Sequence, residues 1–187
     1  MRISRKLGSV LVAMVLGTGA MNAMAQQASA PAAQSQGVLS GALTVGIPAG
    51  FEGSDLPENP GVPGAKGKMY INRSAKQLVL VTESPSGVKT GKNDPAFLNG
   101  AAQGFEAQQK RAEPSYARTG ESVFTVGGIG VKRIDATSKM NGQPVLLTSF
   151  FAAANDKLVV MNAYSAQKDA AGHEALTKAL AGQLSAR

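Results

Sequence analysis

The chain has 187 residues, a formal net charge of +7, 43% hydrophobic residues and no cysteine. This length predicts a single domain that can bury a core without disulfide bonds. The absence of cysteine excludes disulfides, thiolate metal sites, cysteine nucleophiles and an acylated N-terminal cysteine. Only 5% of the residues are aromatic and none is tryptophan, so few side chains are present on which bases or sugars could stack.

Residues 1–25 have the three-part layout of a secretory signal peptide. Basic residues at the start precede an apolar run from Val10 to Leu16, and the triplet Ala23-Met24-Ala25 predicts cleavage before Gln26. A membrane anchor is the alternative, but the apolar run is shorter than the ~20 residues that a span needs. Cleavage leaves 16 basic and 12 acidic residues, a charge of +4. We expect a bacterial periplasmic protein, and not a lipoprotein because it has no cysteine.

The rest of the chain divides into a linker and one folded domain. Residues 26–37, rich in Ala, Gln and Ser, predict a disordered linker, and residues 38–187 predict a single domain. In this domain, Val38 to Ile47 predicts a first strand at a sheet edge. Residues 51–68 contain three Pro and four Gly and predict a long loop, which is either a solvated connection or a functional element.

Further segments bounded by turn residues and rich in Val, Ile, Leu, Phe or Thr predict strands. The expected strands are Met69 to Ile71, Leu78 to Thr82, Glu121 to Val126, Ile129 to Ser138, Val145 to Ala152 and Leu158 to Tyr164. The dipeptide Asn141-Gly142 favours a type I′ turn between two of them. Several of these strands are apolar on both alternating faces, which predicts a covering layer on each side of the sheet.

Two helices are expected beside these strands. Asp94 as N-cap and Pro95 at the first position begin a helix that should end near Arg111. Its Gly100 and Gly104 each cost about 1 kcal/mol relative to alanine. We interpret them as a close approach of the helix to the sheet, with a bound ligand in place of side chains as the alternative. Residues 168–185 predict a closing amphipathic helix. The chain is therefore expected to be an α+β protein, a three-layer α/β/α sandwich with a mostly antiparallel sheet.

No motif predicts catalysis, a metal site or a cofactor. The only histidine, His173, lacks the second histidine of an HExxH zinc helix because Thr177 stands at that position, and we interpret it as an exposed helix residue. A serine triad would need the same histidine and a nucleophile elbow that the sequence lacks. The run Gly127-Gly128-Ile129-Gly130 leads into a strand and predicts a turn or bulge instead of a phosphate loop. We expect no enzymatic activity.

Two sets of charged residues are candidates for other roles. Arg133 and Asp135 stand two apart on one strand, so both point to one face; a structural ion pair is the favoured interpretation and a ligand site the alternative. A second set is expected in loops or turns near the first hairpin and consists of Lys66, Lys68, Arg73, Lys76, Lys89 and Lys92. These six are candidate contacts for an envelope protein or an anionic membrane surface, with ordinary solubility as the simpler account. Nucleic acid is disfavoured.

The order of these parts resembles the DcrB family of bacterial envelope proteins over about Leu39 to Leu184. The likeness rests on FEAQQKR at the end of the first helix, on Ile134-Asp135, on Asn141-Gly142-Gln143 and on the strand order. The resemblance implies a PsbP-like fold and a periplasmic protein linked to envelope maintenance and phage uptake, with no established enzymatic activity. Familiar members are acylated on a cysteine, so their membrane anchoring does not carry over to this chain.

These observations lead to two expected functions. The first is a non-catalytic periplasmic protein that acts through an envelope protein or a membrane surface. The second is a small-molecule or lipid carrier with a pocket between the sheet and the helix from Asp94 to Arg111. No cofactor is expected for either.

Overall fold

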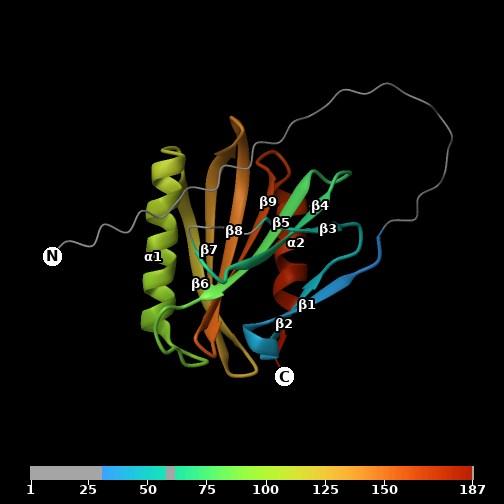
Figure 1. Ribbon diagram of the computed structural model, residues 1–187. Coiled ribbons are helices and arrows are strands. Elements are labelled where there is room, and N and C mark those ends of the chain that lie inside the picture. The colour runs from blue at the N-terminus through green and yellow to red at the C-terminus, as the bar shows by residue number, and fades with distance from the viewer. Residues whose placement is uncertain (1–30, 58–61, 187) are drawn as a thin grey trace.

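The computed structural model describes residues 31–57 and 62–186, so the predicted signal peptide lies outside the described residues. A seven-stranded sheet stands at the centre, with one helix on each face and a three-stranded sheet against one side (Figure 1). Every strand pair in both sheets is antiparallel. The predicted three-layer α+β arrangement is confirmed.

The large sheet has the spatial order β3-β4-β5-β9-β8-β7-β6. Its strands, in chain order, are β3 (Glu52–Asp55), β4 (Lys66–Asn72), β5 (Gln77–Pro85), β6 (Ala117–Val126), β7 (Ile129–Met140), β8 (Gln143–Ala154) and β9 (Lys157–Ala166). The last four form a meander, and β5 pairs with β9 to join the N-terminal strands to it. The four predicted strands of this meander are confirmed, each of them longer than expected.

Tight turns set the register of the meander. Asn141 and Gly142 both have positive φ (50° and 76°), as the predicted type I′ turn requires. Asn155 and Asp156, in the turn between β8 and β9, also have positive φ (52° and 59°). Because both turns match the twist of the strands, Val131–Met140 pairs with β8, and Val145–Ala154 with β9, without a shift in register.

One face of the large sheet carries the main core. Helix α2 (Ala170–Gly182) and the small sheet of β1 (Gln34–Val38), β2 (Leu43–Ile47) and β10 (Ser185–Ala186) cover it, with the short helix η1 (Leu39–Gly41) between β1 and β2. Side chains from β2, β5, β8, β9 and α2 form the largest buried apolar cluster, which includes Val45, Val81, Phe150, Met161 and Leu180. The burial of alternate residues on each strand places these side chains on the α2 side.

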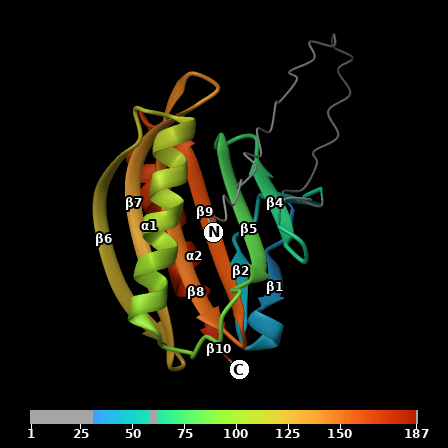
Figure 2. The ribbon, with the colours of Figure 1, turned by 60° about the vertical axis from the view of Figure 1, so that its left-hand side comes forward.

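Helix α1 (Pro95–Ala112) covers only part of the opposite face. Asp94 caps it, accepting a hydrogen bond from the backbone N–H of Phe97 at 3.0 Å. The helix lies over β7 and β8 (Figure 2) and contributes Leu98 and Ala102 to a cluster with Phe151. On this face Leu78 and Leu80 of β5 stay only partly buried, so the expected cover over both faces of β5 is incomplete.

Two boundaries differ from the sequence-based expectation. Gln34–Val38 pairs with Leu43–Ile47 around η1, so Val38 to Ile47 is not one strand, and the linker expected over 26–37 is wrong for residues 34–37. Residues 51–68 are not wholly a loop, because they contain β3 and the start of β4, and these two strands pair with each other. In both segments long-range pairing provides backbone partners that local composition does not reveal.

The glycines of α1 also differ from expectation. Gly100 and Gly104 are exposed, and a Cβ built at either would meet nothing within 4 Å. They lie on the solvent side of the helix and not against the sheet, so the predicted close approach is wrong. Leu98 and Ala102 turn the hydrophobic face of the helix toward the sheet. Gly100 and Gly104 are therefore on the opposite side of the helix.

Candidate functional site

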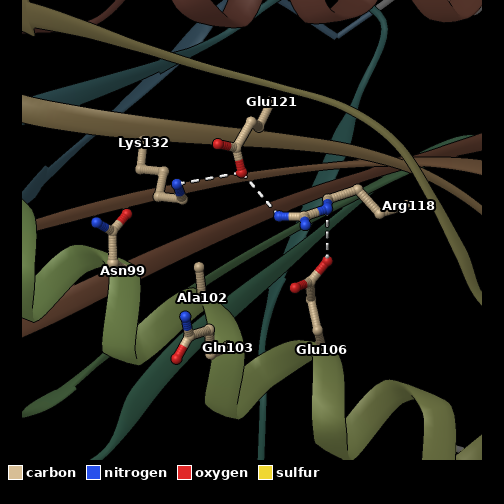
Figure 3. Close-up of a pocket in the computed structure, with 7 residues that line it drawn as sticks. All are labelled: Asn99, Ala102, Gln103, Glu106, Arg118, Glu121 and Lys132. Atoms are coloured by element: carbon tan, nitrogen blue, oxygen red, sulfur yellow. Dashed lines mark hydrogen bonds and ion pairs between the residues drawn. The ribbon is translucent and has the colours of Figure 1, made fainter.

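A cavity of about 260 Å³ lies between α1 and the strands β6 and β7. Figure 3 shows its seven lining residues: Asn99, Ala102, Gln103, Glu106, Arg118, Glu121 and Lys132. Four of them come from α1, two from β6 and one from β7. Apart from Ala102 these side chains are polar or charged, so the cavity suits a polar ligand better than an acyl chain.

The four charged side chains of the cavity form a connected set. Arg118 Nη1 contacts Glu121 Oε2 at 2.7 Å, and its Nε lies 3.4 Å from Glu106 Oε1. Lys132 Nζ lies 3.4 Å from the same Glu121 oxygen. A shift in register between Arg118 and Gly120 of β6 turns this edge strand locally, as a bulge does. The set carries two positive and two negative charges.

Sequence reasoning did not single out these residues. One signal was present, because Lys132 alternates with Gly130 and Ile134 on the face of β7 that turns toward α1. A lysine at an inward position of a buried strand is unusual and points to a special environment. Glu106, Arg118 and Glu121 carry no such signal, since each is an ordinary residue of an amphipathic helix or an edge strand.

The six basic residues proposed for a partner do not share one surface. Lys66 and Lys68 lie within β4 and not in a loop, and Lys68 pairs with Asp55 at 3.1 Å. Arg73 pairs with Glu52 at 3.4 Å and lies with Lys76 beyond the far end of β4. At a rise of about 3.3 Å per residue, that end is about 23 Å from Lys66. The six candidate residues therefore do not form one continuous surface, because β4 separates Lys66 from Arg73 and Lys76.

Three of those lysines do lie toward one end of the large sheet. Lys89 and Lys92 belong to the connection from β5 to α1, which passes Asp156 and Gly130: Thr90 N–H bonds Asp156 Oδ1 at 3.0 Å, and Gly130 N–H bonds the Lys92 carbonyl at 2.7 Å. Lys66 begins β4 at the same end. Val88, in the same connection, is 57% exposed. We call Lys66, Val88, Lys89 and Lys92 the basic end.

Arg133 and Asp135 form an ion pair, as their spacing predicts. Arg133 Nη2 lies 2.9 Å from Asp135 Oδ1, and Arg133 Nε donates to both carboxylate oxygens at 2.9 and 3.0 Å. The guanidinium also lies over the ring of Phe150, 5.8 Å from its centre. The pair belongs to the face covered by α2 and does not line the cavity beside α1.

This ion pair continues into a buried polar chain that includes the only histidine. Asp135 Oδ1 accepts a hydrogen bond of 2.6 Å from the Thr148 hydroxyl, whose oxygen lies 3.0 Å from His173 Nε2. His173 Nδ1 lies 3.0 Å from the Ser165 hydroxyl. His173 is 8% exposed, so its interpretation as an exposed helix residue is wrong. We call Arg133, Asp135, Thr148, His173 and Ser165 the polar chain.

The polar chain determines which nitrogen of His173 carries the proton. Since the Thr148 hydroxyl donates to the Asp135 carboxylate, its oxygen must accept from Nε2–H of His173. Nδ1 is then the acceptor for the Ser165 hydroxyl. Burial lowers the pKa of His173 below 6.5, against the opposite effect of the Asp135 charge. The imidazole is therefore neutral at pH 7, and Ser165 and Thr148 are too deeply buried to reach a substrate.

We expect the folded protein to lose stability on acidification through His173. Its pKa is lowered in the folded state, so the unfolded chain binds more protons and the free energy of unfolding falls as pH drops below about 6.5. The decline from this group ends below the folded pKa. Urea unfolding from pH 7.5 to 5 measures it, and His173→Gln should flatten the slope; an unchanged slope would contradict the assignment.

The described residues contain no helix that is both long and apolar enough to cross a membrane. Within the same residues, no three His, Asp or Glu side chains gather closely enough to hold a metal ion.

Comparison with known proteins identifies the fold of this chain. No family model and no curated protein matches the chain. Among solved structures it is similar to CyanoP, the cyanobacterial PsbP of Synechocystis sp. PCC 6803, with a TM-score of 0.62 and 11% identity over 92% of this chain and 99% of that one. The chain has a PsbP-like fold. This likeness does not extend to function at such a low identity, and membership of the DcrB family has no support from these comparisons.

Two further structures match the PsbP-like domain less closely. LpqN of Mycobacterium tuberculosis, described as involved in cell envelope biogenesis, gives a TM-score of 0.48 at 17% identity over 82% of this chain and 90% of that one. A protein of unknown function from Pseudomonas aeruginosa, PA94, described as a putative regulator, gives 0.45 at 14% identity over 75% and 88%.

Proposed function

We propose that this PsbP-like protein is an exported, non-catalytic protein of the periplasm that binds an acidic surface on an envelope protein. The proposal rests chiefly on the basic end, where Val88 is 57% exposed next to Lys89. An exposed apolar side chain among cations suits a partner that offers an apolar contact within an acidic surface. The predicted signal peptide and the resemblance to DcrB proteins favour an envelope setting and a role in envelope maintenance.

Site-specific crosslinking tests this proposal. A photoreactive residue in place of Val88, expressed in living cells, should give a discrete protein adduct, and one in place of exposed Gln108 on α1 should not. Changing Lys66, Lys89 and Lys92 together to Gln should reduce the Val88 adduct at least tenfold. The same charge change at Lys110, Arg111 and Lys139, also exposed but outside the basic end, should leave it intact.

Two outcomes would count against a protein partner. An adduct that is equally strong with the Lys66, Lys89 and Lys92 variant would show that charge at the basic end does not guide binding. Co-sedimentation with anionic vesicles, lost in that variant, together with no protein adduct, would assign the basic end to the membrane surface.

Binding of a small molecule is a second candidate function, and the cavity beside α1 favours it. The cavity lies between the sheet and the first helix, where a carrier pocket was expected. Its charged lining favours a polar ligand over a lipid. Native mass spectrometry of the protein released gently from cells should show a bound mass that disappears on denaturation; an unliganded protein at every gentle condition would argue against a carrier.

A further inference from the structure

The two most buried charges of the cavity have opposite signs and stand on opposite walls. The Lys132 side chain, on β7, is 8% exposed, and the Glu106 side chain, on α1, is 13% exposed. Figure 3 shows them facing the same space from the sheet and from the helix. Their neighbours Arg118 and Glu121 are about half exposed, at 46% and 51%.

Both buried charges are poorly paired. Within the described residues, Lys132 has one carboxylate contact, to Glu121, and Glu106 has one cationic contact, to Arg118, each at 3.4 Å. Hydrogen bonds between oppositely charged groups are usually 2.7–2.9 Å long. The short contact of the set, 2.7 Å, joins the more exposed Arg118 and Glu121 instead. An ammonium has three donors, so Lys132 keeps donors for another acceptor.

Stability alone does not explain such an arrangement. A buried charge costs several kcal/mol unless close partners compensate it, and replacing a buried ion pair by apolar residues is often neutral or stabilising. On the sheet face under α1, Lys132 stands beside the buried apolar side chains of Ile134 on its own strand and Phe151 on β8. A ligand that brings a carboxylate to Lys132 and a cation to Glu106 would supply the compensation that both groups lack.

We propose that this cavity binds a small zwitterion of the amino-acid class. Its carboxylate would bind Lys132, its ammonium would bind Glu106, and the amides of Asn99 and Gln103 would contact its remaining polar groups. The four charged lining residues sum to zero, so the cavity has no net preference for an anion or a cation, whereas its two buried charges favour a ligand with both. The inference rests on the second proposed function, binding of a small molecule.

The size of the cavity agrees with this class. Pockets for drug-sized ligands range from about 300 to 1,000 Å³, and this cavity, at about 260 Å³, lies just below. The space suits a compact molecule, and Ala102 is the one apolar side chain among the seven lining residues, too little for a long hydrocarbon chain.

A titration of the mature protein with matched ligands tests the ligand class. The panel contains free α-amino acids, ω-amino acids of two to six carbons, and for each the carboxylate without the amine and the amine without the carboxylate. Amide shifts of β7 and α1 in two-dimensional NMR report binding at the cavity. We expect at least one zwitterion to bind at least tenfold more tightly than both of its single-charge analogues.

Two variants test which protein charge binds each charged group of the ligand. Glu106→Gln should make the zwitterion bind no better than its carboxylate analogue, and Lys132→Met, which keeps most of the apolar stem, should make it bind no better than its amine analogue. Glu174→Gln and Lys139→Met are the matched controls, since both change exposed charges away from the cavity, and they should leave the preference unchanged.

The outcomes separate the ligand class from ligand binding itself. If a carboxylate or an amine alone binds as tightly as every zwitterion, the zwitterion inference is overturned while small-molecule binding survives. If no compound shifts the β7 and α1 amides at 50-fold excess, and native mass spectrometry finds no ligand, both fail. The wild-type panel decides the class even if a variant does not fold.

Discussion

Replacing both Gly100 and Gly104 by alanine should raise the free energy of unfolding by about 2 kcal/mol, because each glycine in a helix interior costs about 1 kcal/mol relative to alanine. Both positions are exposed, and an added Cβ meets nothing within 4 Å. For a chain of this size such a gain corresponds to about 4–8 °C in Tm. Urea or thermal unfolding of the double variant measures it.

Replacing a third glycine, Gly46, should lower the free energy of unfolding and serves as the control. Gly46 lies in β2, and a Cβ there would stand 2.6 Å from the Cβ of Gln183 and 3.2 Å from its backbone oxygen. Gly46→Ala should therefore destabilise the protein, since the end of α2 would have to move. A loss of stability in the Gly100 and Gly104 variant would show that α1 packs closely against something on its outer side.

Thr148→Val should lower the free energy of unfolding by about 1–3 kcal/mol. Thr148 is fully buried, and its hydroxyl joins the Asp135 carboxylate to His173 Nε2. Valine has nearly the same shape and a good strand preference, so packing changes little, but the N–H of His173 loses its acceptor inside the protein. A buried donor without a partner costs an amount of this order.

A matched variant and a double-mutant cycle separate this effect from other causes. Thr137→Val, on the neighbouring strand β7 but on the same face of the sheet as Thr148 and only partly buried, should change stability by less than about 0.5 kcal/mol. Adding His173→Leu to Thr148→Val should cost less than the sum of the two single changes, because the unpaired donor is then gone. Additive losses would show that Thr148 and His173 contribute independently.

The face that each residue occupies explains which site features were predictable. Arg133 and Asp135 are two apart on a strand, so their pairing follows from local geometry. His173 is different: whether a polar residue of α2 is exposed depends on how the helix is rotated over β8 and β9. The threonine and serine that compensate its burial come from those strands, 25 and 8 residues earlier in the chain.

The cavity beside α1 is a product of tertiary structure. Glu106, Arg118, Glu121 and Lys132 come from one helix and two strands, and they meet because α1 crosses β7 while β6 bends at its irregular register. Of these four residues, only Lys132 could be recognised from the sequence, because it occupies an inward position of a buried strand. The basic end shows the same dependence, since β4 separates Arg73 and Lys76 from Lys66, whereas the connection from β5 to α1 brings Lys89 and Lys92 to the same end of the sheet as Lys66.

The amino-acid sequence by itself determined the local features of this protein: the turns at Asn141-Gly142, the Asp94 cap, the strands of the meander and the two helices. Their causes lie within a few residues, in backbone conformation, capping and hydrophobic period. Only the tertiary structure decided that β1 and β2 form a separate small sheet, that Gly100 and Gly104 face solvent, and that Lys132 and Glu106 share a cavity. Those outcomes depend on pairing and packing between distant segments, where register and helix rotation decide which side chains meet.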